Sequence, residues 1–199
     1  TPTGLTLNDV YVISPNDVYA VGYGGTIVHY DGTSWSAMNS GTAATLNGVW
    51  GSGPNDVYAV GDNGILLHYD GRYWLNYSSG TASRLNAIWG SGPDNIYAVG
   101  DKGAAVHYDG SAWSRINAGT GYNLLDIWGS GPNEIYAVGG GYYYESVNWC
   151  SVVTHFNGTT WSSRWWLGDY LYGVGGTGPG NAYVVGYNGY LERLSGGYT

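Results

Sequence analysis

The sequence repeats one unit five times, and this repeat constrains the fold more than any other feature. The segment that begins at Leu46 and reads LNGVWGSGPNDVYAVGDNGILLHYDG recurs with small changes along the 199-residue chain. Its first leucine returns at Leu7, Leu46, Leu85, Leu124 and Leu171, and its proline at Pro15, Pro54, Pro93, Pro132 and Pro179. A period of about 40 residues is typical of propellers and other arrays, in which one supersecondary unit packs against its copies.

Each copy predicts four short β-strands. In the second copy the apolar or aromatic runs cover 46–50, 57–60, 65–69 and 73–77, and turns rich in Gly, Asn, Asp and Pro separate them. The run 57–60 is apolar at every position, as expected for a sheet packed between two others. We therefore expect an all-β chain, a five-bladed β-propeller of four-stranded antiparallel blades. A linear β-solenoid is the alternative, although no caps for its two open ends are recognisable.

The last copy is incomplete, because it reaches only about Leu194 before its fourth strand is due. We expect one domain over 1–199, made of repeats 7–45, 46–84, 85–123 and 124–170 and a fifth that joins 171–199 to 1–6. Residues 1–6 would then lie against the last blade, so that the termini close the ring and remove exposed sheet edges. A three-stranded final blade or a truncated longer array is the alternative.

The repeat resembles known bacterial propeller repeats. The pattern WGSGPNDVYAVGDNG followed by HYDGxxW is similar to repeats of large surface and secreted proteins. Its Asp-Gly-x-x-Trp corner resembles the Asp-box of sialidase-type propellers, and it recurs at Asp31–Trp35, Asp70–Trp74 and Asp109–Trp113. Five blades with aromatic-rich loops are also similar in architecture to tachylectin-like lectins, a resemblance that implies binding of amino sugars. Propellers carry many functions, so these resemblances bear on the fold more than on the ligand.

Composition excludes several partners. The chain has six Lys and Arg residues and a net charge of −8, too few cations for a nucleic-acid groove. No apolar run is long enough to predict a membrane-inserted helix. A chain poor in Lys and rich in Gly, Asn, Ser and Tyr is typical of secreted or surface-displayed bacterial domains. We therefore expect an extracellular or cell-surface protein, in which Thr1 would begin a mature or excised segment beside flanking domains of a larger protein.

Residues that recur at one position in three or four of the copies are expected to build the scaffold. One histidine position and two tryptophan positions recur in this way: His29, His68, His107 and His155; Trp50, Trp89 and Trp128; and Trp35, Trp74, Trp113 and Trp161. We expect the histidines to form hydrogen bonds within their own blades, because copies around a ring are too far apart to share a metal ion. The tryptophans are expected to pack between blades. No cofactor or metal site is predicted, and nothing in the sequence supports bound calcium.

Residues that depart from the repeat are the better candidates for function. The fourth copy has eight extra residues between Gly139 and Val152, in the connection of its second and third strands, and unusual aromatics before the fifth copy. Because strand direction alternates, both segments should emerge on one face. Three asparagines at the ends of first strands add a polar rim. The predicted ligand-binding residues are Tyr142, Tyr143, Tyr144, Glu145, Asn148, Trp149, Trp165, Trp166, Asp169, Tyr170, Asn8, Asn47 and Asn86.

Aromatic faces beside Asn, Asp and Glu are suited to sugars, because rings stack on C–H groups while amides and carboxylates bind hydroxyls. We therefore expect a non-catalytic, lectin-like propeller whose partner is a glycan or cell-surface ligand. The alternative is a structural or protein-interaction module of a larger surface protein. A third reading, a glycoside hydrolase, would need two carboxylates such as Asp9 and Asp126, but no acid in an apolar setting is evident.

Overall fold

The computed structural model describes residues 2–143 and 148–194, which form five antiparallel sheets in sequence order. Blade 1 contains β1 (Leu7–Ser14), β2 (Asp17–Gly22), β3 (Ile27–Tyr30) and β4 (Trp35–Met38). Blade 2 contains β5 (Leu46–Gly53), β6 (Asp56–Gly61), β7 (Leu66–Tyr69) and β8 (Trp74–Tyr77). Blade 3 contains β9 (Leu85–Gly92), β10 (Asn95–Gly100), β11 (Ala105–Tyr108) and β12 (Trp113–Arg115).

The last two blades carry the departures from the repeat. Blade 4 contains β13 (Asn123–Gly131), β14 (Glu134–Tyr143), β15 (Asn148–Phe156) and β16 (Trp161–Leu167). Blade 5 contains β17 (Leu171–Gly176), β18 (Ala182–Gly186) and β19 (Leu191–Leu194). Every blade but the fourth turns between its second and third strands through a short 3-10 element, namely η1 (Tyr23–Gly25), η2 (Asp62–Gly64), η3 (Asp101–Gly103) and η4 (Tyr187–Gly189). In blade 4 the inserted residues instead lengthen β14 and β15, which remain paired as far as Tyr143 and Asn148.

The core lies between consecutive blades and is built from the same positions each time. In blade 2, Tyr58, Val60 and Leu66 pack with Leu85, Ile88 and other buried residues of blade 3. The equivalent residues of blades 1, 3 and 4 pack in the same way on blades 2, 4 and 5. The strands β6 and β10 are therefore covered on both faces, as the uninterrupted apolar runs predict.

Tryptophans of the first strands fit against glycines of the following blade, which confirms their predicted role in packing. A Cβ atom added at Gly90 would lie 2.6 Å from the Trp50 ring, and one at Gly129 would lie 2.6 Å from the Trp89 ring. Trp128 stands in the same relation to Gly176. Each of these three junctions therefore pairs a large residue with the residue that leaves most room for it.

The repeated histidines lie within their own blades, as predicted. The Nε2 atoms of His29 and His68 lie 2.7 Å from Oδ1 of Asp17 and Asp56, and Nε2 of His107 lies 2.7 Å from Oδ1 of Asn95. All four imidazoles also stack on the tyrosine of the neighbouring second strand, at ring separations of 4.2 to 4.4 Å. The position is thus a packing and hydrogen-bonding position of the blade.

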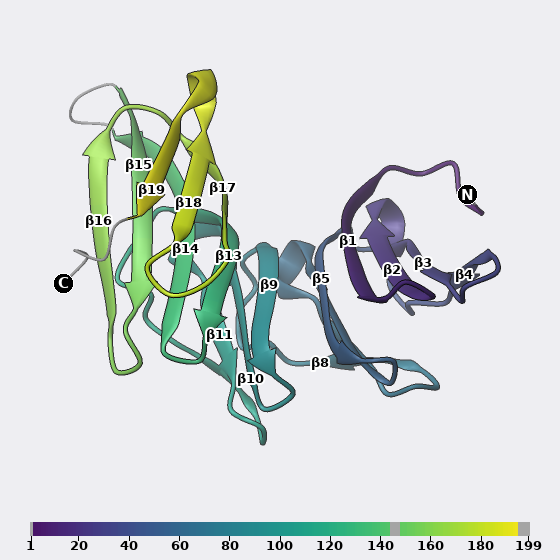
Figure 1. Cartoon of the computed structure of the whole chain (residues 1–199). Helices are drawn as coiled ribbons and strands as arrows, with labels where there is room; N and C mark the ends of the chain where they lie inside the picture. Colours follow the sequence, from purple (N-terminus) through teal and green to yellow (C-terminus); the bar gives the residue numbers. More distant parts are fainter. Residues whose placement is uncertain (1, 144–147, 195–199) are drawn as a thin grey trace.

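The prediction of a ring closed by the termini is wrong. Among the described residues, blade 5 has the three strands β17-β18-β19 and not four. In the part of the chain that the structure describes, extensive contacts join only consecutive blades, and Figure 1 shows blade 1 and blade 5 at opposite ends of an arc. The N-terminal segment has a partner in its own blade, because the backbone N–H of Tyr23 donates to Thr6 O at 3.0 Å. Thr6 thus takes the place that Thr45 and Arg84 take in blades 2 and 3, and residues 2–6 do not complete blade 5.

Candidate functional site

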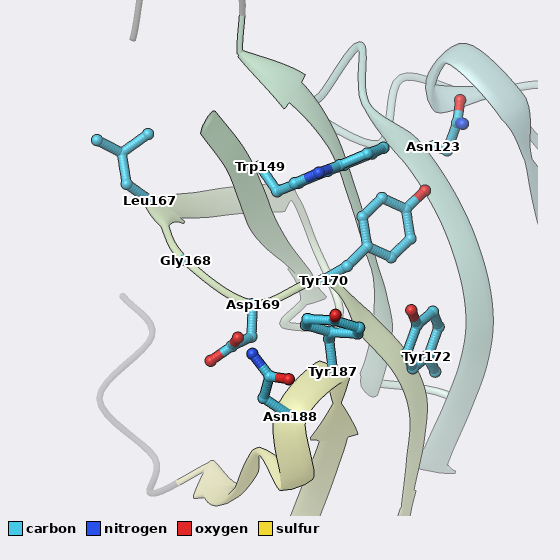
Figure 2. Close-up of a pocket in the computed structure, with 9 residues that line it drawn as sticks. All are labelled: Asn123, Trp149, Leu167, Gly168, Asp169, Tyr170, Tyr172, Tyr187 and Asn188. Carbon is cyan, nitrogen blue, oxygen red and sulfur yellow. The ribbon is translucent and has the colours of Figure 1, made fainter. Parts of the chain in front are cut away.

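An open pocket of about 880 Å³ lies at the junction of blades 4 and 5. It is on the face toward which the long hairpin of β14 and β15 extends. Figure 2 shows its side chains converging from β15, from the connection between β16 and β17, from β17 itself and from η4. The lining residues are Asn123, Trp149, Leu167, Gly168, Asp169, Tyr170, Tyr172, Tyr187 and Asn188. The structure thus brings the two irregular segments of the sequence together on one face, as the alternation of strand direction predicts.

Backbone hydrogen bonds fix the connection that forms the floor of the pocket. The N–H of Gly168 donates to Trp149 O at 3.0 Å, which ties the connection to β15. The Ser151 hydroxyl donates to the carbonyl oxygen of Asp169. The N–H of Tyr187 donates to Tyr170 O at 2.8 Å, which ties the same segment to η4. Segment 167–170 is therefore held on both sides by regular secondary structure.

Aromatic rings dominate the pocket. Trp149 meets Tyr170 edge to face at a ring separation of 5.6 Å, and Tyr170 lies 5.7 Å from Tyr172. Trp149 is 56% exposed and Tyr187 is equally so. Large exposed rings gathered around a hollow usually mark a binding surface, since leaving them in water is unfavourable.

The polar groups that line the pocket can form hydrogen bonds, and Asp169 among them is acidic. Burial raises the pKa of the Tyr170 phenol, which keeps it protonated and able to donate a hydrogen bond. Asp169 and Asn188 line the same pocket as Tyr187 (Figure 2). Among the described lining residues there is one carboxylate and neither Lys nor Arg. A ligand with apolar and cationic groups would therefore match this lining better than an anionic one.

Of the residues predicted from the sequence, Trp149, Asp169 and Tyr170 line the pocket. Trp165 lies on β16, half-exposed and 6.5 Å from the ring of Tyr122, whereas Trp166 packs against the core between blades 4 and 5. Backbone pairing places Tyr142 opposite Trp149 and Tyr143 opposite Asn148 on the long hairpin. Tyr144 and Glu145 lie outside the described residues.

The predicted asparagine rim joins blades to one another. The side-chain amides of Asn8, Asn47 and Asn86 donate to the carbonyl oxygens of Leu46, Leu85 and Leu124 at 2.8 to 3.0 Å. Asn47 and Asn86 also donate to Asp62 and Asp101 in their own blades. These amides hold consecutive first strands together, and a contact of theirs with a ligand stays a prediction.

Sequence reasoning missed Asn123, Leu167, Gly168, Tyr172, Tyr187 and Asn188 as pocket residues. Two of them carry a signal in the repeat. Tyr172 stands where the first three copies have asparagine, and Tyr187 stands where copies two and three have aspartate. Both substitutions put a ring at the junction with blade 4, so a search of the fifth copy for departures from the repeat would have found them.

The two carboxylates considered for glycoside hydrolysis accept hydrogen bonds from backbone N–H groups. Asp9 accepts from the N–H groups of Val10 and Val49, each at 2.8 Å. Asp126 likewise accepts from Ile127 at 2.9 Å and from Val174 at 2.8 Å. Burial raises the pKa of both groups, and the negative charge of Asp9 adds to the rise at Asp126. Each carboxylate thus bridges a blade to its successor, an arrangement that fits a structural role.

The blades define a β-propeller repeat protein, and comparisons with solved structures agree with this class. The chain is similar to YCF48 from Cyanidioschyzon merolae, with a TM-score of 0.68 and 18% identity over 96% of this chain and 70% of that one. It is similar to YCF48 bound to D1 peptide, with a TM-score of 0.56 and 18% identity over 100% of this chain and 82% of that one. The WD40 β-propeller domain of Doa1 gives a TM-score of 0.46 and 9% identity over 96% of this chain and 82% of that one. No protein-family model and no curated protein matches the sequence.

Proposed function

We propose that this chain is a protein-interaction propeller that binds an extended segment of a partner protein in the pocket between blades 4 and 5. The observation that carries the proposal is the gathering of Trp149, Tyr170, Tyr172 and Tyr187 around one open hollow of about 880 Å³. Such a hollow can take one or two large side chains of a peptide. Tryptophan and tyrosine are also the residues that most often dominate protein interfaces.

The chemistry of the lining indicates the kind of segment. Phenol and amide groups of Tyr170, Tyr187 and Asn188 can form hydrogen bonds with a peptide backbone. Asp169 is the one charged residue in the described part of the lining, and the protein as a whole has a net charge of −8. A segment with an apolar or aromatic residue beside Lys or Arg fits these groups. A structure similar to this chain contains a bound peptide, which supports a peptide ligand without identifying it.

A carbohydrate ligand is the second candidate, and one observation favours it. The exposed Trp149 ring lies in the same pocket as Asp169 and Asn188, a combination that suits a sugar ring and its hydroxyls. A lectin-like role and an extracellular or cell-surface location therefore stay predictions. The experiment below separates the two ligands.

The test compares two aromatic residues of equal exposure. Trp149 and Tyr73 are each 56% exposed, but Tyr73 lies beside Arg72 in blade 2, outside the pocket. We expect the protein to bind fluorescein-labelled peptides that combine Trp or Leu with Arg. Trp149→Ala should weaken this binding about 30-fold, the effect of losing about 2 kcal/mol at an interface centre, whereas Tyr73→Ala should leave it unchanged.

A glycan array probed with the same three proteins completes the test. Glycan binding that depends on Trp149, with no peptide binding, would replace the proposal by the lectin. Equal peptide binding by the protein and its Trp149→Ala variant would show that the pocket is not the peptide-binding site. Thermal unfolding of each variant shows whether a loss of binding reflects a loss of fold.

A further inference from the structure

The two ends of the arc expose surfaces that the repeat buries everywhere else. We call the side of a blade that packs on its successor the forward face, which in blade 2 is formed by Trp50, Tyr58, Val60 and Leu66. The side that receives the preceding blade is the backward face, which in blade 2 includes Leu46, Val49 and Val57. Blade 5 has a forward face and blade 1 a backward face that no described blade covers.

The forward face of blade 5 is apolar and open. Tyr183 is 42% exposed and Leu191 is 68% exposed, and Val185 is half-exposed between them. Their counterparts in the other four blades are all buried, and the tyrosines among these are Tyr19, Tyr58, Tyr97 and Tyr136. Blade 5 thus retains the chemistry of a packing surface at a place where no other described blade packs against it.

The backward face of blade 1 is the matching case. Val10 is 57% exposed and Val12 is exposed to a similar extent. Val49, Ile88 and Ile127, the counterparts of Val10 in the next three blades, are all buried. Two valines side by side on one face of a first strand form the same kind of surface that receives a neighbouring blade at every internal junction.

Each of these two faces departs from the repeat at one position. Blade 5 has a small residue where the other blades have a large one, and blade 1 has a large residue where the other blades have a small one. Where the first four blades have Tyr11, Trp50, Trp89 and Trp128, blade 5 has Gly175, and a Cβ added there meets nothing within 4 Å. Where the last four blades have Gly51, Gly90, Gly129 and Gly176, blade 1 has Val12. The junctions of blades 2 with 3, 3 with 4 and 4 with 5 set a forward Trp against a backward glycine. The two end faces would set a forward glycine against a backward valine.

We propose that blade 5 of one molecule packs on blade 1 of a second copy of this chain, head to tail. An ordinary blade placed before blade 1 would bring a Trp against Val12, where the junctions of the repeat require Gly. An ordinary blade placed after blade 5 would offer Gly opposite Gly175 and leave a void. Gly175 and Val12 reverse the order of large and small residues found at the other junctions. The forward face of blade 5 therefore fits the backward face of blade 1 better than it fits the backward face of any other blade. The interface is heterologous, so each molecule keeps one face free for a further copy or for closure of the assembly.

Single-face variants test this proposal without depending on how the assembly closes. Leu191→Arg blocks the forward face of blade 5 and Val10→Arg blocks the backward face of blade 1, both at exposed positions that leave the fold intact. The unmodified protein should show concentration-dependent masses at multiples of 21.2 kDa in light scattering coupled to size exclusion. Each variant alone should remain at 21.2 kDa or form no more than a trace of larger species. An equimolar mixture should give a species of twice 21.2 kDa, because each variant supplies the face that the other lacks.

A variant pair at the exchanged positions tests the complementarity itself. Gly175→Trp should abolish association, because its ring would strike Val12 of the next molecule. Combining Gly175→Trp with Val12→Gly recreates the Trp-over-Gly pair of the internal junctions and should restore association. Circular dichroism melts establish that all variants fold.

Three results would overturn the proposal. The unmodified protein could stay monomeric at every concentration. The same result is expected if the two faces meet within one molecule. One single-face variant could dimerise by itself, which would mean like faces pair. The mixture of the two variants could remain at 21.2 kDa, which would mean that the two faces do not recognise each other.

Discussion

Each of the first four blades turns from its third to its fourth strand around one side-chain oxygen. Oδ1 of Asp109 accepts hydrogen bonds from the N–H groups of Ser111 and Ala112 and from the Ser111 hydroxyl. The two backbone hydrogen bonds of this pattern recur at Asp31 and Asp70. In blade 4, Oδ1 of Asn157 accepts from Thr159 and Thr160 at 3.0 Å. The turn therefore needs an acceptor at this position and does not need a charge.

The first prediction follows from this difference between Asp and Asn. The hydrogen bonds from Ser111 and Ala112 lower the pKa of Asp109 from 3.8 to about 2. A carboxyl group with a lowered folded-state pKa stabilises the fold above pH 3.8, and this stabilisation is lost as the pH falls toward 2. Asp109→Asn should keep the turn, as Asn157 does, and should show a smaller fall in melting temperature across this range.

Melting temperatures followed by circular dichroism between pH 5 and pH 2 would check this prediction. Ser36→Ala, a change outside the turns, provides the control and should follow the unmodified protein at each pH. An equal fall for Asp109→Asn and the unmodified protein would show that the carboxylate of this corner does not contribute to acid sensitivity.

The first strand and its contact with the next blade are the elements that make this repeat an array. Trp50 on β5 lies over Gly90 on β9, and the ring leaves no room for a Cβ there. Gly92 lies two residues further along β9, and a Cβ added there meets nothing within 4 Å. Neither glycine has a positive φ, so the two positions differ in the space around them and not in backbone conformation.

The second prediction uses these two glycines as a matched pair. Gly90→Ala should lower the free energy of unfolding by about 1 to 3 kcal/mol, because the new methyl group displaces the Trp50 ring. Gly92→Ala should be neutral or slightly stabilising, since Ala loses less backbone entropy than Gly when a strand forms. Urea unfolding with unchanged m-values would measure both. Equal effects of the two substitutions would contradict the packing described for this junction.

Local patterns predicted the elements well because they act within one repeat. Short apolar runs between Gly- and Asp-rich turns identify the strands, and the histidines and the first-strand tryptophans have the roles that their recurrence predicts. Trp35 is the exception among the fourth-strand tryptophans, because it is exposed and meets Tyr30 of its own blade. The insertion of blade 4 was expected as a connection, whereas most of it continues β14 and β15. Tyr and Trp suit extended strands, so lengthening the hairpin satisfies their backbone groups better than a loop would.

Whole-molecule shape was the part that the sequence could not predict. Closure of a ring depends on the angle between consecutive blades, which is set by the summed packing of many side chains at each junction. The repeat shows that blades pack side by side, but it does not fix this angle. The pocket also depends on how blades pack at a junction. Trp149 and Tyr170 stand out in the sequence, whereas Tyr172 and Tyr187 join them only because blades 4 and 5 pack together.

At the scale of the molecule, the central claim is that the five blades form an open arc. Equivalent positions of the repeat, at or just after the end of the first strand, offer sites for spin labels at Ser14 in blade 1, Gly53 in blade 2 and Gly178 in blade 5. An added side chain meets nothing within 4 Å at Gly53 or Gly178. The native Cys150 is buried and would not react with the label. A background carrying Val10→Arg and Leu191→Arg keeps the protein monomeric, so that only distances within one molecule are recorded.

Double electron–electron resonance on the pairs Ser14→Cys with Gly53→Cys, and Ser14→Cys with Gly178→Cys, tests the open arc most directly. The first pair reports the distance between adjacent blades. The account predicts a clearly longer distance for the second pair, because blades 1 and 5 lie at opposite ends of the arc (Figure 1). The same distance for both pairs would place blade 5 beside blade 1 and contradict it.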